Sequence, residues 1–368
     1  MMGKDIKTNK RDSRILQQPA VTLYQKNTEE MDFYKQVADL LDVARQQAKR
    51  QLDTTIVTTY YEVGRMIVEH EQKGQKRAQY GTRLLKGLSE YLTERYGKGF
   101  SVVNLQSIRK FYQIYTLSKE QTLSAKFTLG WSHYQILMRI ENESARRFYE
   151  IEAESQQWSV RQLQRQVGSS LYERLALSRD KDKVMALANK GQTLENPRDI
   201  FKTPYVFEFT GLEERSEYSE TELEQALINN IQKFLLELGK GFLFEARQKR
   251  FTFGEDSFYV DLVFYNRLLQ CYVIIDLKVG KLKHQDLGQM LMYVNYFDRY
   301  VKQEYEKPTV GILVCSQKND NIVELTLPED TNIYASAYSL YLPDKTLLQC
   351  KLSEWVAEFE EEHGGGSK

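Results

Sequence analysis

The 368-residue sequence has little cysteine, no long apolar run and no net charge, and each absence narrows the class of protein. Three cysteines lie far apart, at Cys271, Cys315 and Cys350, which indicates reduced, buried thiols rather than a disulfide framework. No cysteine and histidine spacing is typical of a zinc site. No segment approaches the roughly 20 apolar residues of a membrane span, and the polar N-terminus lacks the apolar stretch of a secretory signal. We therefore expect a cytoplasmic protein with no membrane partner.

The balance of charge conceals one basic window. Lysine plus arginine and aspartate plus glutamate each total 51, which argues against a protein that is basic all over. Between Lys73 and Lys110, however, nine basic residues outnumber two acidic ones, Glu90 and Glu94, and leave a local charge of +7. Such a window either attracts phosphates or is the solvated face of ordinary helices, and charge alone does not separate the two.

The first half of the sequence has a helical pattern. Residues 1–28 are polar and aperiodic and predict a mobile arm, whereas apolar residues at three-to-four spacing predict helices within 29–176. Residues 80–115 predict a helix, a turn at "GKG" and a second helix that Ser101 can cap. Ser132 and Ser159 are predicted N-caps of later helices, next to the predicted core anchors Trp131 and Trp158.

A helix-turn-helix with basic flanks can place its second helix in the major groove of DNA. In that interpretation, a set of polar and basic side chains contacts nucleic acid. The exposed candidates on the second helix are Asn104, Gln106, Ser107, Arg109 and Lys110, and Arg83 and Lys98 before it are further candidates. Helix pairs joined by glycine turns are also ordinary packing units, so both interpretations stay open.

The second half of the sequence alternates strand and helix patterns. A charged linker with one short helix is predicted at 177–204, and a second domain at 205–358 before a flexible tail at 359–368. The domain begins with an amphipathic helix, "SETELEQALINNIQKFLLELGKG", followed by strands near 242–253, 256–265 and 269–278. A helix from His284, a buried strand, "TVGILVCSQ", and a strand near "NIYASAYSL" complete the order αβββαβ with an added strand. We expect a two-domain α+β protein: an N-terminal all-α, helix-turn-helix-like domain and a C-terminal domain with a mixed central sheet.

Two acids and a lysine lie in the most strand-like segment, "YVDLVFYNRLLQCYVIIDLKVGKL". Strands that only a few residues separate should pair antiparallel, so Asp261 and Asp276 can approach each other. Lys278 follows Asp276 by two residues and therefore shares its face of the strand. Two close carboxylates repel unless a cation lies between them, and oxygen ligands suit Mg²⁺ or Mn²⁺. A lysine beside the metal can activate water or stabilise charge on a phosphorane. The set favours metal-assisted phosphodiester hydrolysis over the alternative, a buried salt bridge.

These motifs together resemble a known family. The helix with Glu224, then "YVDLVFY", "VIIDLKVGK" and "DLGQMLMYVNYF", resembles the nuclease domain of the YhcG-like PDDEXK proteins of bacteria. "YYEVGRMIVEHEQ", "WSHYQILMRI" and "WSVRQLQRQV" resemble its helical domain, so the likeness covers about residues 35 to 350. It implies a restriction-endonuclease-like domain of order αβββαβ behind a helical domain that binds nucleic acid.

The resemblance assigns roles to individual residues. Asp261 and Asp276 match the two metal-binding acids, Lys278 the catalytic lysine, and Gln289 a glutamine placed against the active site. Glu224 matches a helix acid that binds metal through water or orients the lysine. The family commonly has Glu-Leu-Lys where this chain has aspartate at 276, and no proline precedes Asp261.

Other charged residues near the motifs have two interpretations. Lys281, Lys283 and His284 follow the catalytic strand and either contact phosphates or are ordinary surface charges. Glu245 is interpreted as a solvent-facing residue outside the site.

Three functions fit the sequence. The first is a Mg²⁺-dependent endonuclease acting on DNA, and retention of Asp261, Asp276 and Lys278 favours it. The second is a nucleic-acid-binding or protein-interaction module with a weak nuclease site, and the third is an RNA-directed nuclease. Branched DNA is a further candidate substrate, and the 24 tyrosines and 17 phenylalanines leave room for a homo-oligomer interface.

Overall fold

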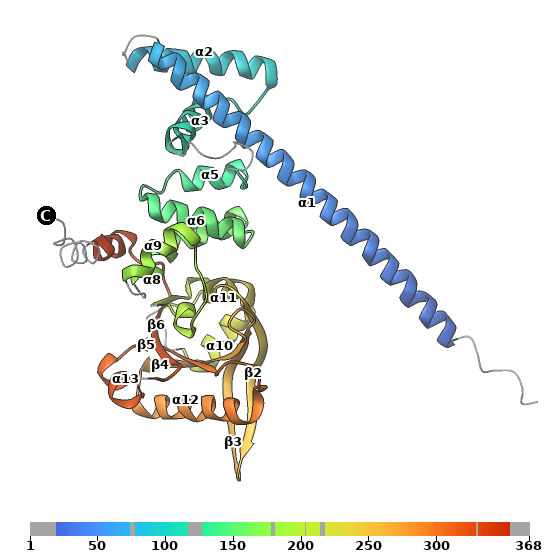
Figure 1. Ribbon diagram of the computed structural model, residues 1–368, viewed down its shortest axis with the longest axis vertical. Helices are drawn as coiled ribbons and strands as arrows, with labels where there is room; N and C mark the ends of the chain where they lie inside the picture. The colour runs from blue at the N-terminus through green and yellow to red at the C-terminus, as the bar shows by residue number, and fades with distance from the viewer. Residues whose placement is uncertain are drawn as a thin grey trace, which may run out of the picture.

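The computed structural model describes residues 20–73, 78–116, 127–177, 181–202, 204–213, 218–328 and 330–353. A stack of helices forms the N-terminal part, and a sheet with helices on both faces forms the C-terminal part (Figure 1). The α+β architecture with a mixed C-terminal sheet is therefore confirmed. Among the described residues, no helix is long and apolar enough to cross a membrane.

One long helix, α1 (Ala20–Lys73), takes the place of the predicted arm and of two separate helical segments. The helix begins inside 1–28, and residues 1–19 lie outside the described residues. Its sequence contains no proline and a single glycine, Gly64, so nothing ends it earlier. A Cβ at Gly64 would lie 2.5 Å from the carbonyl oxygen of Ile108, so this glycine allows another helix to cross α1 closely.

That crossing helix belongs to the pair on either side of "GKG". These helices are α2 (Ala78–Tyr96) and α3 (Val102–Tyr115). Ser101 caps α3 as predicted, accepting a 3.3 Å hydrogen bond from the backbone N–H of Asn104. The apolar stripes of α2 and α3 meet α1 in a small core that includes Ile67, Leu85 and Leu105.

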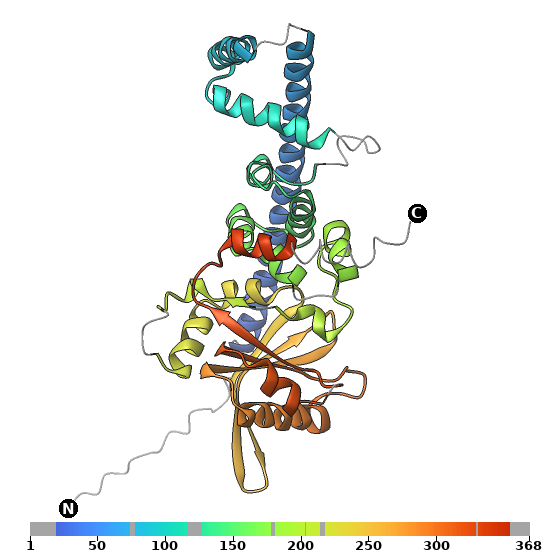
Figure 2. The same cartoon turned by 90° about the vertical axis from the view of Figure 1, so that its left-hand side faces the viewer.

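The remaining helices of the N-terminal part pack around an aromatic core, and Figure 2 shows α5 and α6 end-on. They are α5 (Trp131–Leu137), α6 (Glu143–Ser155), α7 (Val160–Gly168), α8 (Leu171–Leu177) and α9 (Lys181–Lys190). Ser159 caps α7 as predicted, but the prediction for Ser132 is wrong, because α5 begins one residue earlier with Gly130 at its N-cap. Trp158 is buried, whereas Trp131 is only partly buried.

The C-terminal part is one six-stranded mixed sheet, in the order β1-β6-β5-β4-β3-β2. The strands are β1 (Tyr205–Val206), β2 (Phe242–Phe253), β3 (Asp256–Asn266), β4 (Cys271–Lys281), β5 (Val310–Gln317) and β6 (Ile333–Ser339). The pairs β2–β3 and β3–β4 are antiparallel, and the pairs β4–β5, β5–β6 and β6–β1 are parallel. The three predicted central strands and the "GED" turn are thus confirmed.

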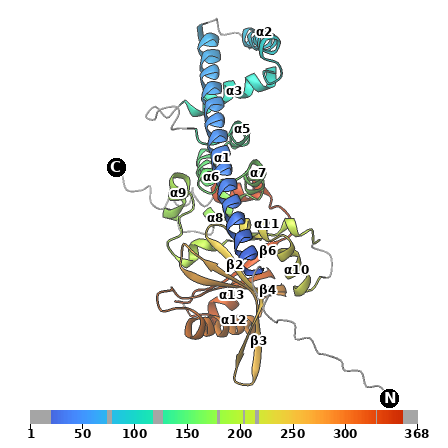
Figure 3. The ribbon, with the colours of Figure 1, turned by 90° about the vertical axis from the view of Figure 1, so that its right-hand side faces the viewer.

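Helices cover both faces of this sheet (Figure 3). One face carries α10 (Glu220–Asn229) and α11 (Ile231–Leu238), and the other carries α12 (His284–Tyr296), η3 (Phe297–Val301) and α13 (Asp320–Thr326). The single helix predicted before the strands is two helices, because the backbone of Asn230 leaves the helical region (φ −114°, ψ 33°). Cys271 and Cys315 are buried as expected, but Cys350 is exposed.

The two parts meet at a buried cluster of charges. Glu237 on α11 is fully buried, and its carboxylate lies 2.5 Å from Arg174 on α8 and 3.2 Å from Arg165 on α7. Burial alone would raise the pKa of Glu237, but Arg174, Lys202 and Arg165 outweigh it and lower the pKa to about 2. Lys202, fully buried in the predicted linker, donates to the carbonyl oxygen of Glu237. The linker therefore contains α9, the 3₁₀ turn η1 (Pro197–Ile200) and core residues rather than a solvated connection.

Candidate active site

The strand β3 changes its geometry at Asp261. Val260 and Val263 both contact the core on the α12 face, whereas Leu262 belongs to the core on the α10 face, so strict alternation breaks here. The β3–β4 ladder runs from Asn266–Cys271 to Leu262–Ile275, and the next position would pair Asp261 with Asp276. At this level a side chain replaces the backbone ladder: the carboxylate of Asp261 accepts a 2.9 Å hydrogen bond from the N–H of Leu277. The two acids therefore lie on neighbouring strands at the same level of the sheet.

Asp276 is buried inside this end of the sheet. Burial, followed by repulsion from Asp261, raises its pKa to about 7. Its Oδ2 atom forms an ion pair with the ammonium of Lys278 at 2.8 Å. Asp276 and Lys278 thus share one strand face.

Lys278 lies among acids from two strands and one helix. Burial alone would lower its pKa, but Asp276, Glu220 and Asp261 together outweigh burial and raise it. Glu220, the first residue of α10, approaches the ammonium to 3.9 Å and accepts a 3.3 Å hydrogen bond from the N–H of Val279. Lys278 is therefore held as a cation, and Glu220 is a neighbour of the site that the sequence did not single out.

Glu224, one turn further along α10, is buried beneath β2. Its carboxylate accepts hydrogen bonds from Arg247 and Gln248. Gln248 donates a second hydrogen bond, 2.9 Å long, to Oδ1 of Asp261. Glu224 therefore connects to the acid pair through Gln248 and has no ion pair with Lys278 among the described contacts.

Gln248 has a left-handed backbone, with φ of 46° in the middle of β2. Non-glycine residues in this region cost about 1–3 kcal/mol and concentrate at functional sites. The geometry directs the Gln248 amide toward both Glu224 and Asp261. Sequence reasoning missed this residue because a glutamine within a charged run, "EARQKR", carries no signal of its own.

Gln289 lies on the other side of the sheet, on α12. Its amide donates to the hydroxyl of Tyr293, which in turn donates a 2.9 Å hydrogen bond to the carbonyl oxygen of Tyr259 on β3. Tyr259 is two residues from Asp261, so this chain of hydrogen bonds ties α12 to the strand that carries the acid. Gln289 is partly exposed, and no hydrogen bond joins it to either acid among the described residues.

The donor set fits a hard divalent cation. Among the described residues, no group of three or more histidine, cysteine or acidic side chains surrounds a common point. The acid pair instead combines oxygen donors with mutual repulsion, and a cation between the two carboxylates would relieve that repulsion. Magnesium keeps several waters and needs only one or two protein carboxylates. Asp261 and Asp276 are the residues that would hold it.

The predicted nucleic-acid contacts divide into two groups. Arg83, Lys98, Lys110, Lys281 and Lys283 are exposed. Arg109 and Asn104, which the helix-turn-helix interpretation expected to be exposed, are only partly so and have partners within the helical part. Arg109 pairs with Glu71 at 2.9 Å, and Asn104 accepts hydrogen bonds from Trp131 and Gln135. Both hold α3 against its neighbours.

Comparison with known proteins identifies the family. Residues 198–353 match the YhcG PDDEXK nuclease domain, and residues 36–174 match the DUF1016 N-terminal domain. The chain is 39% identical over 361 residues to a protein of Escherichia coli (strain K12) named "Putative nuclease YhcG", covering 89% of this chain and 96% of that protein. The chain belongs to the YhcG family of PDDEXK-type nucleases.

Solved structures resemble only part of a YhcG chain. A repair endonuclease from Pyrococcus abyssi is 22% identical over 36% of this chain, with a TM-score of 0.24. EndoMS in its apo form is 18% identical over 35% of this chain, with the same TM-score. The chain spans about half the length of each. The family relationship therefore rests on the sequence matches.

Proposed function

We propose that this protein is a Mg²⁺- or Mn²⁺-dependent endonuclease that hydrolyses phosphodiester bonds of DNA. The observation that carries the proposal is the acid pair Asp261 and Asp276 beside the cationic Lys278, where the pairing of β3 with β4 ends. When bound, the metal would polarise the phosphate and activate water. The exposed lysines after β4 and in the basic window of the helical part supply positive charge for the substrate backbone.

Each residue of the site has a distinct role in this proposal. Asp261 and Asp276 hold the metal, and the N–H of Leu277 fixes the orientation of Asp261. Lys278, kept protonated by its acidic neighbours, stabilises negative charge as it develops on the transferred phosphate. A raised lysine pKa favours this electrostatic role over removal of a proton from water. Glu224 and Gln289 act through Gln248 and Tyr293 as positioning residues.

The test compares cleavage of labelled DNA and RNA by the wild-type protein, Asp276→Ala and Lys278→Ala, with Mg²⁺, Mn²⁺ or EDTA. Glu255→Ala, at the exposed tip of the β2–β3 hairpin, is the matched control. We expect metal-dependent cleavage of DNA that both site variants lose and the control retains. Wild-type cleavage no greater than that of Asp276→Ala would overturn the enzyme proposal. Cleavage of RNA and not of DNA would show that RNA is the substrate.

A further inference from the structure

Residues 30–52 of α1 form an arm that no other described part of the chain covers. Figure 1 shows it pointing away from the helical stack and the sheet. Every residue from 30 to 52 is exposed, and contacts with the body begin near Thr54, whose hydroxyl donates to the carbonyl oxygen of Phe127, and the buried Val57. At 1.5 Å per residue, these 23 exposed positions extend about 35 Å.

The exposed arm carries a continuous apolar stripe. At 3.6 residues per turn, its members fall within about 120° of the helix circumference. They are Phe33, Val37, Leu40, Leu41, Ala44, Ala48 and Leu52. Leu40 is 70% exposed and Phe33 is 60% exposed. Isolated helices are marginal in water, and most helices gain stability by burying one apolar face. The stripe therefore indicates a helical partner.

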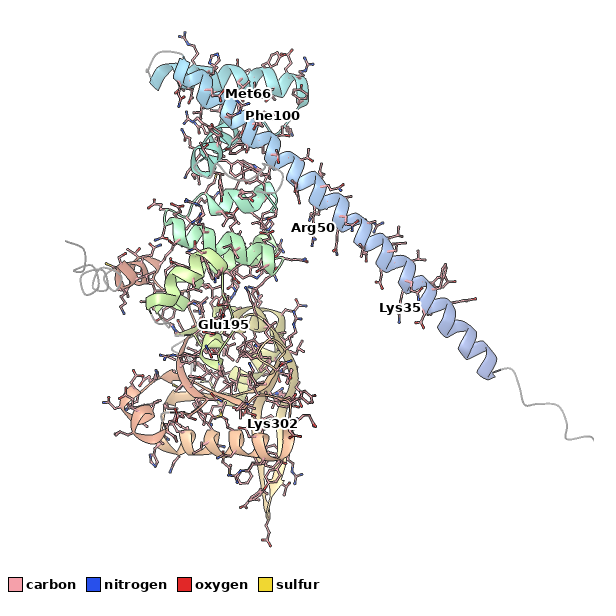
Figure 4. The ribbon with its side chains drawn as sticks, in the orientation of Figure 1. Lys35, Arg50, Met66, Phe100, Glu195 and Lys302 are labelled. Atoms are coloured by element: carbon pink, nitrogen blue, oxygen red, sulfur yellow. The ribbon has the colours of Figure 1, made fainter. Side chains whose placement is uncertain are left out.

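The charges of the arm are divided along its length. Residues 30–42 contain four acids, Glu30, Asp32, Asp39 and Asp42, and one base, and have a net charge of −3. Residues 43–52 contain three bases, Arg45, Lys49 and Arg50, no acid, and have a net charge of +3. Figure 4 shows Lys35 and Arg50 in the two halves of the projecting arm. A parallel partner copy would bring like charges together, whereas an antiparallel copy would bring opposite charges together.

We infer that two copies of this chain associate through the exposed halves of their α1 helices, packed antiparallel. With the crossing near Asp42, the acidic segment 32–41 of one copy lies level with the basic segment 43–52 of the other, and the apolar stripes face each other. The inference depends on α1 alone and not on the proposed nuclease activity. The resulting particle carries two candidate active sites.

The acidic first half disfavours nucleic acid as the occupant of the stripe, because phosphates would be repelled there. It also disfavours a strongly acidic or strongly basic protein, which would match only one half. A second copy matches both halves at once and needs no further partner.

The first experiment measures the mass of the full chain in solution by sedimentation between about 1 and 100 µM. We expect twice the chain mass of 43.3 kDa, falling to 43.3 kDa for Val37→Glu/Leu41→Glu. The control is Asp39→Asn, which lies on the charged face and should leave the dimer intact. Circular dichroism checks that the variants keep their helical content. A monomeric wild type, or a dimer that the glutamate variant does not affect, would overturn the inference.

The second experiment tests orientation by disulfide crosslinking in a Cys350→Ser background. Phe33→Cys and Gln51→Cys lie on the same stripe, nine residues on either side of Asp42. In an antiparallel pair, a mixture of the two single variants crosslinks, while each alone does not, because two copies of residue 33 are then about 27 Å apart. Efficient crosslinking of Phe33→Cys to itself would show a parallel pair and overturn the proposed arrangement.

Discussion

The amide of Gln248 donates a 2.9 Å hydrogen bond to the carboxylate of Asp261 from the neighbouring strand, while also donating to the buried Glu224. This contact depends on a left-handed backbone at Gln248. It joins α10, which covers one face of the sheet, to the acid in the middle of β3. Gln248 is thus a positioning residue for the proposed metal site, and its effects on activity and on stability can be separated.

Replacing Gln248 tests that separation. We expect Gln248→Ala and Gln248→Gly each to lower cleavage about 10- to 100-fold, as is typical when a partner of a metal ligand is removed. Glycine adopts a φ of 46° without strain, so Gln248→Gly should be more stable than Gln248→Ala by about 1 kcal/mol. Thermal unfolding and single-turnover cleavage measure the two effects. Equal cleavage by wild type and both variants would remove Gln248 from the site.

Metal binding should release a proton. The pKa of Asp276 is about 7 without metal, and a ligand carboxylate must be deprotonated, so metal affinity should fall about tenfold per pH unit below pH 7. Calorimetric titration with Mn²⁺ in buffers of different ionisation enthalpy should report about one proton at pH 6 and none at pH 8. Asp276→Asn should bind weakly with no such proton release. A pH-independent affinity of the wild type would contradict the coupling.

The buried charge cluster predicts a large stability effect. Glu237→Gln leaves Arg174, Arg165 and Lys202 without their buried anion, and breaking such a pair typically costs about 3–5 kcal/mol. The control is Glu245→Gln, since Glu245 is exposed and pairs only with Lys249, a contact worth less than about 1 kcal/mol. Urea unfolding of the two variants measures the difference. Similar unfolding midpoints would mean that the cluster contributes little.

The basic window predicts a selective loss of binding. Lys98→Ala/Lys110→Ala should weaken DNA binding and lower the slope of log affinity against log salt by about 2. Lys190→Ala, an exposed lysine of α9 outside the window, should change neither. Arg109→Ala should mainly lower stability, because Arg109 pairs with Glu71. Fluorescence anisotropy at several salt concentrations gives the slopes, and an unchanged slope for the double variant would exclude these lysines.

A carboxyl group in the helical part predicts a pH-dependent stability. Burial raises the pKa of Glu150 to about 7, despite a 3.3 Å hydrogen bond from Tyr115. Since the folded pKa exceeds the unfolded value near 4.5, the stabilising contribution is full below pH 4.5 and is lost as pH rises through 7. Glu150→Gln should therefore gain stability relative to wild type between pH 5 and 8, by up to about 3 kcal/mol. A constant difference across that range would contradict the assignment.

Much of the fold could be predicted because periodicity reports burial. The three central strands and the caps at Ser101 and Ser159 follow from local patterns and are confirmed. Two helix boundaries could not be predicted. The start of α1 at Ala20 depends on a helix that continues through polar sequence, and the break at Asn230 is a backbone bend without proline or glycine.

The candidate site shows the same division. Asp261, Asp276 and Lys278 stand out because charges are rare within apolar strands. Gln248 and Glu220 come from β2 and from the start of α10, distant in sequence, and meet the acids only through the three-dimensional fold. The exposure of individual basic side chains could not be predicted either. Nothing in the sequence distinguishes Arg109, which pairs with Glu71, from the exposed Lys110.

The charge cluster at the junction has a consequence for inheritance. Arg165 and Arg174 belong to the region 36–174, whereas Lys202 and Glu237 belong to the region 198–353. A nuclease half recombined with an unrelated helical half would carry a fully buried anion without two of its three cations. A functional exchange of either half would therefore need a matching change at position 237, so the buried cluster couples the two regions.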